Sequence, residues 1–182
     1  MKIIEEALNG LLLIEPRVFR DNRGYFFESF KAEKYSESGI NFNFVQDNLS
    51  KSSRNTIRGL HYQIEPMAQG KLCQVVYGRV RDVAVDIRHG SSTYGQAYIT
   101  ELSDENFRQL WIPPGFAHGF LVLSETAVFN YKCTKYYSQP HERSILFNDP
   151  ELNIQWGCDH PIVSEKDLGA KPFSTIEKDF TF

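Results

Sequence analysis

The sequence predicts an all-β fold, a jelly-roll sandwich or barrel with a few short helices, in one domain spanning residues 1–182. From residue 42 to about residue 150, short apolar runs of strand length follow one another, and Gly or Pro residues separate them. Aromatic residues make up 14% of the chain, with fourteen Phe and nine Tyr, and this composition favours strands. No linker, repeat or low-complexity tract interrupts the pattern, so the chain is expected to bury a single core.

The N-terminal part predicts a strand, a turn and a helix. Residues 11–14 (LLLI) predict a short buried strand, and residues 21–24 (DNRG) predict a tight turn because Asn and Gly tolerate positive φ. Residues 25–30 (YFFESF) are strand-like with aromatic side chains on both faces, which indicates burial on both sides or contact with another subunit. Residues 31–38 predict a short helix that Gly39 ends.

The rest of the chain is almost entirely β in pattern. Further strands are predicted at residues 44–48, 72–77, 80–87, 98–102, 108–112, 119–123 and 127–133. Residues 72–77 and 80–87 flank Gly78 and predict a β-hairpin. After about residue 150 the pattern gives way to polar, Pro-containing sequence, with a short helix expected near Ser164.

Charge and cysteine content exclude several classes of protein. The formal net charge is −3, so no overall field attracts nucleic acid, and an anionic ligand requires a local basic cluster. No apolar run is long enough to span a bilayer, and the N-terminus lacks the apolar core of a signal peptide. Cys73, Cys133 and Cys158 form no CxxC pair, which supports neither a disulfide framework nor a zinc site. We expect a cytoplasmic protein without a nucleic-acid or membrane partner.

The strongest concentration of chemistry lies in residues 58–63 (RGLHYQ) and 69–71 (QGK). A guanidinium and an ammonium this close to an imidazole suit an anionic or carbonyl-bearing ligand. His61 is the leading candidate for a base, since imidazole titrates near neutral pH, and Lys71 could stabilise an oxyanion. The plainer alternatives are a structural histidine on a strand and a solvated lysine after a turn.

Two more side chains, those of Tyr131 and Asp167, could take part in proton transfer. Tyr131 shares a predicted strand with Lys132, and the alternation of side chains points these two neighbours to opposite faces. Tyr131 could be a general acid, because a nearby ammonium lowers the pKa of a phenol, or it could be a core tyrosine. Asp167 could orient His61, although its spacing from Ser164 also matches a helix capping box.

Other residues have a functional and a structural interpretation of similar weight. His118 follows a Pro-Pro-Gly loop and could either serve a site or cap that loop. Tyr136 and Tyr137 could stack on a planar ligand or cover the edge of the core. Metal-binding jelly rolls often use an HxH pair, but Gln63 takes the second position here, so no metal site is expected. Candidate phosphate clamps, each otherwise an ordinary surface charge, are Arg23, Arg58, Arg88 and Arg143.

Together these stretches resemble the dTDP-4-dehydrorhamnose 3,5-epimerase family. The resemblance runs through nearly the whole chain, at residues 21–26, 44–48, 58–61, 69–72, 82–88, 116–120, 131–134 and 164–167. It implies a cupin-type jelly-roll homodimer that needs no metal or cofactor. The implied substrate is a dTDP-4-keto-6-deoxy sugar, inverted at carbons 3 and 5 on the route to L-rhamnose for polysaccharide biosynthesis.

The resemblance also implies a role for individual residues. His61 matches the family's base, Tyr131 its acid, Asp167 the carboxylate that pairs with the base, and Lys71 the ammonium near the ketone oxygen. Tyr137 matches an aromatic residue that stacks on thymine. The other positions implied to bind the substrate are Arg23, Phe26, Glu28, Gln46, Asp47, Asn48, Arg58, His118, Glu142 and Lys166. Of these, the first three are implied to reach the site of the partner subunit.

Three alternatives remain at this point. The chain could invert only carbon 3 or carbon 5 of another dTDP-4-keto-deoxysugar, it could be a metal-dependent cupin such as a dioxygenase, or it could be a barrel that only binds a nucleotide sugar. The sequence does not distinguish double from single epimerisation. It also leaves open the final deoxysugar and any assembly beyond a dimer.

Overall fold

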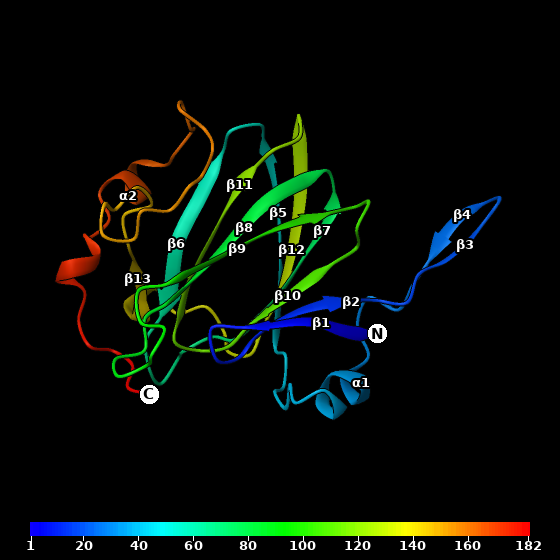
Figure 1. The fold of residues 1–182 in the computed structure, drawn as a ribbon, viewed down its shortest axis with the longest axis horizontal. Coiled ribbons are helices and arrows are strands. Elements are labelled where there is room, and N and C mark those ends of the chain that lie inside the picture. The colour runs from blue at the N-terminus through cyan, green and yellow to red at the C-terminus, as the bar shows by residue number, and fades with distance from the viewer.

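The computed structural model describes residues 1–182, and all but two of its strands lie in two β-sheets packed face to face (Figure 1). The strands of the six-stranded sheet are, in spatial order, β1 (Lys2–Ala7), β2 (Leu11–Glu15), β10 (Gln109–Ile112), β7 (Lys71–Tyr77), β12 (Thr126–Cys133) and β5 (Gln46–Ser53). Those of the five-stranded sheet are β13 (Glu142–Ser144), β6 (Ile57–Gln63), β11 (Phe116–Val122), β8 (Arg79–Asp86) and β9 (Ala97–Ser103). The predicted all-β sandwich is confirmed.

The remaining elements are short. A separate hairpin consists of β3 (Phe19–Asp21) and β4 (Gly24–Phe26), and the helices are α1 (Ala32–Glu37), α2 (Glu165–Leu168) and the 3-10 turns η1 (Gln139–His141) and η2 (Phe173–Thr175). The helices expected after residue 31 and near Ser164 are therefore present. No helix has the length and apolar character required to cross a membrane.

The core has three layers because strand side chains alternate between two faces. Between the sheets, Phe129 of β12 stacks on Phe120 of β11, with ring centroids 4.3 Å apart. A second apolar cluster, which includes Trp156 and Phe173, lies where the C-terminal segment covers the outer face of the five-stranded sheet. A third cluster, which includes Tyr35 of α1, covers part of the outer face of the other sheet. Burial on both faces explains why many strands read as continuous apolar runs.

The hairpin predicted around Gly78 is wrong. Strand β7 pairs with β10 and β12, whereas β8 pairs with β11 and β9, so the turn carries the chain from one sheet to the other. Gly78 has a φ of +80°, and a Cβ atom there would lie 2.2 Å from the carbonyl oxygen of Thr126. Glycine is required here because the backbone passes so close to Thr126 as it moves between the sheets, and not because the residue forms a β-hairpin turn.

The strand predicted at residues 25–30 is also shorter than expected, because β4 ends at Phe26. The β3–β4 hairpin, here called the arm, projects from the β1–β2 side of the body (Figure 1). Its aromatic side chains are largely exposed, with Phe26 at 67%. Of the two predicted alternatives, burial of both aromatic faces within one chain therefore does not hold.

Two glycines bring the strands of the site close together. A Cβ atom on Gly59, whose φ is +123°, would lie 2.6 Å from the Cα atom of Gly119. These residues lie on β6 and β11, in which His61 and His118 are register partners. The glycines thus permit a close approach of the two strands that carry the histidines.

Candidate active site

The site is built around an imidazole–carboxylate pair. His61 lies on β6 and Asp167 on α2, and His61 Nε2 is 2.6 Å from Asp167 Oδ1. The carboxylate is only 3% exposed, and its second oxygen accepts a hydrogen bond from the Gly59 amide at 3.4 Å. With Nε2 held by Asp167, Nδ1 is the ring nitrogen left to act on a ligand.

The two interpretations of Asp167 are both correct. Its backbone amide donates to Ser164 Oγ at 3.2 Å, which caps the N-terminus of α2. Its side chain at the same time reaches His61. The cap fixes the first turn of the helix, and that turn directs the carboxylate at the imidazole.

The environment of Asp167 keeps it ionised. Burial by itself raises the pKa of the carboxyl, but the hydrogen bond and charge of His61, with the Gly59 amide and Ser164 hydroxyl, hold the pKa below its usual value. The anionic carboxylate holds the imidazole of His61 in one orientation through the hydrogen bond to Nε2.

Lys71 and Tyr131 share a cleft of about 100 Å³ with His61. Lys71 of β7 is 9% exposed, and its Nζ lies 3.4 Å from the carbonyl oxygen of His61 and 5.9 Å from the centre of the Tyr131 ring. Because β6 and β12 belong to opposite sheets, the imidazole and the phenol enter the cleft from opposite walls. A planar ring bound between them would meet a proton acceptor on one face and a donor on the other.

The predicted direction of the Tyr131 pKa is wrong. Burial of the phenol, reinforced by the nearby Cys133 and Cys73, raises its pKa to about 12 and outweighs the hydrogen bond with Asn48 and the charge of Arg58. The phenol consequently keeps its proton throughout the neutral range. In this protonated form the phenol is able to donate a proton to a bound ligand.

A second cleft of about 530 Å³ adjoins the first at His61 and is basic. It is lined by Lys51, Arg58 and Lys166. Arg58 Nε donates to Ser52 Oγ at 2.9 Å, which leaves its terminal nitrogens for a ligand. This is the local cationic cluster that a chain of net charge −3 needs to hold an anion.

Comparison with known proteins identifies the family. The family model described as dTDP-4-dehydrorhamnose 3,5-epimerase matches residues 5–175. The chain belongs to the dTDP-4-dehydrorhamnose 3,5-epimerase family. It is 53% identical to the enzyme of that name from Pseudomonas aeruginosa, over 97% of this chain and 98% of the relative, and 51% identical to the one from Shigella flexneri, over 95% and 96%.

Solved structures agree with the sequence relatives. A crystal structure of dTDP-6-deoxy-D-glucose-3,5-epimerase from Legionella pneumophila, in complex with dTDP-4-keto-L-rhamnose, superposes with a TM-score of 0.95 at 49% identity. The match covers 100% of this chain and 98% of that one. The predicted family, cupin-type jelly-roll fold and enzyme class are confirmed, and this chain is an epimerase.

The epimerase fold brings most of the predicted site residues together. Besides His61, Lys71 and Tyr131, the smaller cleft is lined by Gln46, Asn48, Tyr137 and Glu142. Lys166 joins the two clefts, because its Nζ lies 2.6 Å from Glu142 Oε2 and its side chain lines the basic cleft.

Two predicted binding residues of the β-sheets, Asp47 and His118, lie outside the two clefts. Asp47 points away from the cleft and pairs with Lys132 at 2.9 Å. His118 is buried between the sheets, where its Nε2 lies 3.0 Å from Asp82 Oδ1, so it neither lines the cleft nor caps its loop. Burial lowers the pKa of His118 despite the nearby Asp82 carboxylate, which leaves a neutral ring beneath the site.

The arm residues do not reach the cleft of their own chain. Arg23 pairs with Asp21 at the tip of the arm, at 2.5 Å, and Glu28 pairs with Lys34. Neither they nor Phe26 line either of the two clefts that contain His61.

Two of the candidate phosphate clamps are structural. Arg88 is 2.8 Å from Asp86, donates to the Leu8 carbonyl and lies over the ring of Phe116. Arg143 donates to backbone carbonyls within its own segment, at Pro140 and Glu142. Neither lines the clefts around His61.

Lys51, Ser52 and Gln69 also line the clefts, although the sequence pattern assigns them no individual role. Gln69 lies in the predicted 69–71 stretch, beside the glycine and the lysine, and only its place in that loop marks it. Gln63, which takes the position of a metal ligand, is buried in the wall of the site. No group of three or more His, Cys, Asp or Glu side chains is arranged to hold a metal ion.

We expect Asp167→Asn to lower the free energy of unfolding near neutral pH. The folded-state pKa of Asp167 lies below its usual 3.8, so its contribution is complete well above that pH and is lost as the pH falls through the folded-state value. Urea denaturation of both proteins across acid and neutral pH measures the difference, and the exposed Asp159→Asn is the matched control. A wild-type advantage over Asp167→Asn that is the same in acid as at neutral pH would contradict this account.

Proposed function

We propose that this epimerase converts dTDP-4-dehydro-6-deoxy-D-glucose to dTDP-4-dehydro-L-rhamnose by removing and returning protons at carbons 3 and 5. The observation that carries the proposal is the shared cleft in which His61 and Tyr131 come from opposite sheets. Both carbons lie next to the ketone at carbon 4, so one base, one oxyanion partner and one opposite acid serve both inversions.

Proton removal is the task of His61 and Lys71. A proton next to a ketone is weakly acidic, and the enolate must be stabilised as it forms. The ammonium of Lys71 supplies positive charge to the oxygen at carbon 4, and a donor in such a position contributes about 3 kcal/mol. The imidazole of His61, oriented by Asp167, takes the proton, and a positioned base accelerates such a step by about 10²–10⁴-fold.

Inversion requires a proton from the opposite face of the sugar. Tyr131 is suited to this step because burial raises the pKa of its phenol to about 12, so the proton is retained until the enolate forms. Return of the proton from His61 would only restore the original configuration. Tyr131 therefore decides between exchange and inversion.

The nucleotide end of the substrate extends along the two clefts. Arg58 and Lys166 are proposed to bind the diphosphate, since a guanidinium offers forked donors to its oxygens. Tyr137 is proposed to stack on the thymine, and Glu142 holds the Tyr137 hydroxyl at 2.9 Å.

The arm is proposed to complete the site of a second copy of the chain. Arg23 and Phe26 belong to a projecting hairpin whose aromatic side chains are largely exposed within its own chain. In a symmetric dimer, each arm would bring these residues and Glu28 to the partner's substrate. The proposal includes a single catalytic domain over residues 1–182 and a cytoplasmic location, in keeping with three free thiols.

In D₂O, we expect the enzyme to introduce deuterium at both carbon 3 and carbon 5 of dTDP-4-keto-6-deoxyglucose, because one base serves both positions. Proton NMR of the sugar measures the incorporation. His61→Ala is the control and should abolish it at both carbons. Labelling of a single carbon would indicate a single-carbon epimerase of another dTDP-4-keto-deoxysugar, and labelling in the His61→Ala variant would remove His61 as the base.

Tyr131→Phe should impair inversion far more than proton exchange. The variant keeps the ring that packs near Phe129 but loses the donor on the opposite face. We expect deuterium wash-in to remain within about tenfold of wild type while product formation falls by about 10²-fold or more, the contribution of a positioned acid. Equal losses of exchange and product would contradict the assignment of Tyr131 as the acid.

Mixing two inactive variants tests the arm. In a heterodimer of His61→Ala with Arg23→Ala, one site receives His61 from one subunit and Arg23 from the other, while the second site lacks both. We expect an equal mixture to recover roughly a quarter of wild-type activity after subunit exchange, because half the dimers are mixed and each has one intact site. Activity no higher than the mean of the two separate variants would show that the arm does not serve the partner.

A further inference from the structure

Four consecutive backbone positions in the loop after β12 are held by glutamine side chains. Gln69 Nε2 donates to the Lys135 carbonyl at 2.8 Å, and Gln63 Nε2 donates to the Tyr136 carbonyl at 3.1 Å. The next two amides donate in turn, that of Tyr137 to Gln46 Oε1 at 2.8 Å and that of Ser138 to Gln63 Oε1 at 2.7 Å. The three glutamines, Gln46, Gln63 and Gln69, are here called the glutamine clamp.

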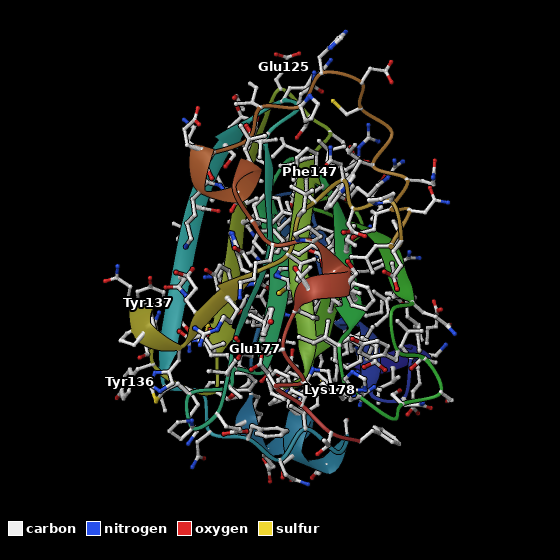
Figure 2. The ribbon with its side chains drawn as sticks, turned by 90° about the vertical axis from the view of Figure 1, so that its left-hand side faces the viewer. Glu125, Tyr136, Tyr137, Phe147, Glu177 and Lys178 are labelled. Atoms are coloured by element: carbon white, nitrogen blue, oxygen red, sulfur yellow. The ribbon has the colours of Figure 1, made fainter.

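The loop has little else to hold it. Lys135, Tyr136 and Tyr137 form no hydrogen bond from backbone to backbone, since they lie between the end of β12 and η1. Their side chains are largely exposed, and Figure 2 shows Tyr136 and Tyr137 on this loop beside one end of β6. The conformation of the loop therefore depends on the side chains that bind its backbone.

Gln63 is the central member of the clamp. It is 4% exposed, and its Nε2 also donates to the Met67 carbonyl at 2.7 Å. Both amide hydrogens and the amide oxygen are thus engaged, so the side chain joins the loops on either side of it through a fully satisfied buried network. Replacing it leaves three partly buried backbone groups without these hydrogen bonds, whereas replacing the partly buried Gln69 frees only one.

The position of Gln63 connects the loop to the catalytic strand. Gln63 follows His61 by two residues on β6, so both side chains point to the same face of the sheet. At this position an HxH protein would carry a second metal ligand, but here the amide binds the loop. Tyr137 of that loop lines the same cleft as His61.

We propose that Gln63 is a positioning residue, which holds the loop of Tyr136 and Tyr137 in the conformation that receives the nucleobase. This inference rests on the function proposed above, since it assigns the loop to the thymidine end of the substrate. Gln63 acts on nucleotide binding through the backbone of the loop. It takes no part in proton transfer.

The test uses Gln63→Met, which keeps the side-chain volume and removes the hydrogen bonds, with Gln69→Ala as a milder second variant. The control is Gln155→Met, an exposed glutamine whose amide binds only Asn153 in its own turn. Titration calorimetry with dTDP measures Kd, steady-state assays with the dTDP-4-keto sugar measure KM and kcat, and hydrogen exchange follows residues 134–141 in the free protein.

For Gln63→Met we expect Kd and KM to rise about tenfold or more, since three partly buried backbone groups lose their hydrogen bonds, with kcat at saturation within about threefold of wild type. Amide exchange should accelerate in residues 134–141 but not in β6. Gln69→Ala should shift Kd in the same direction by less, and it decides the question if Gln63→Met does not fold. Gln155→Met should match wild type.

Three results would overturn the inference. Unchanged Kd and unchanged exchange in the folded variants would show that the clamp does not order the loop. A fall in kcat at unchanged Kd would assign Gln63 to the chemistry instead. A wild-type protein that fails to bind dTDP would remove the nucleobase assignment, whereas one that binds dTDP but does not epimerise would refute the proposed function and leave the clamp standing.

Discussion

The structure depends most on the hydrogen bond between His61 and Asp167, which joins residues 106 positions apart in the chain. A carboxylate that is almost fully buried is strongly destabilising unless it is paired, so the folded state retains Asp167 only with its partners in place. The close approach of Gly59 to Gly119 and the cap at Ser164 both serve this contact. The geometry needed for a base is therefore also a condition of folding.

Because the fold has two sheets packed face to face, the cleft has two facing walls, which a single sheet could not provide. Strand β6 contributes the imidazole of His61, while β7 and β12 of the other sheet contribute the ammonium of Lys71 and the phenol of Tyr131. Burial by itself raises the pKa of both Tyr131 and Asp167, but the net shifts of the two groups have opposite directions. Burial raises the pKa of Tyr131 to about 12 and so preserves a donor, whereas at Asp167 hydrogen bonds overcome burial and preserve an anion. The direction of each shift depends on its hydrogen-bond partners and not on burial alone.

Several polar side chains that could have been assigned to chemistry hold the backbone instead. Arg88 joins Asp86 to the turn after β1, and Gln63 joins two loops at the edge of the site. Long polar side chains can do this because they carry several donors with fixed geometry. In this epimerase, the loops that shape the cleft are ordered largely by such contacts and not by regular secondary structure.

The sequence by itself determined most of the long strands, the two short α-helices and the family motifs. Strand positions, the helix at α2 and the cluster of His61 with Lys71 follow from neighbours along the chain, because periodicity and capping are local properties. Only the tertiary structure decided that β7 and β8 belong to different sheets, that Arg88 is structural, that His118 lies below the cleft and that the pKa of Tyr131 is raised. Sheet partners and loss of water depend on residues distant in sequence, and a strand that is apolar on both faces does not specify which neighbour it will meet.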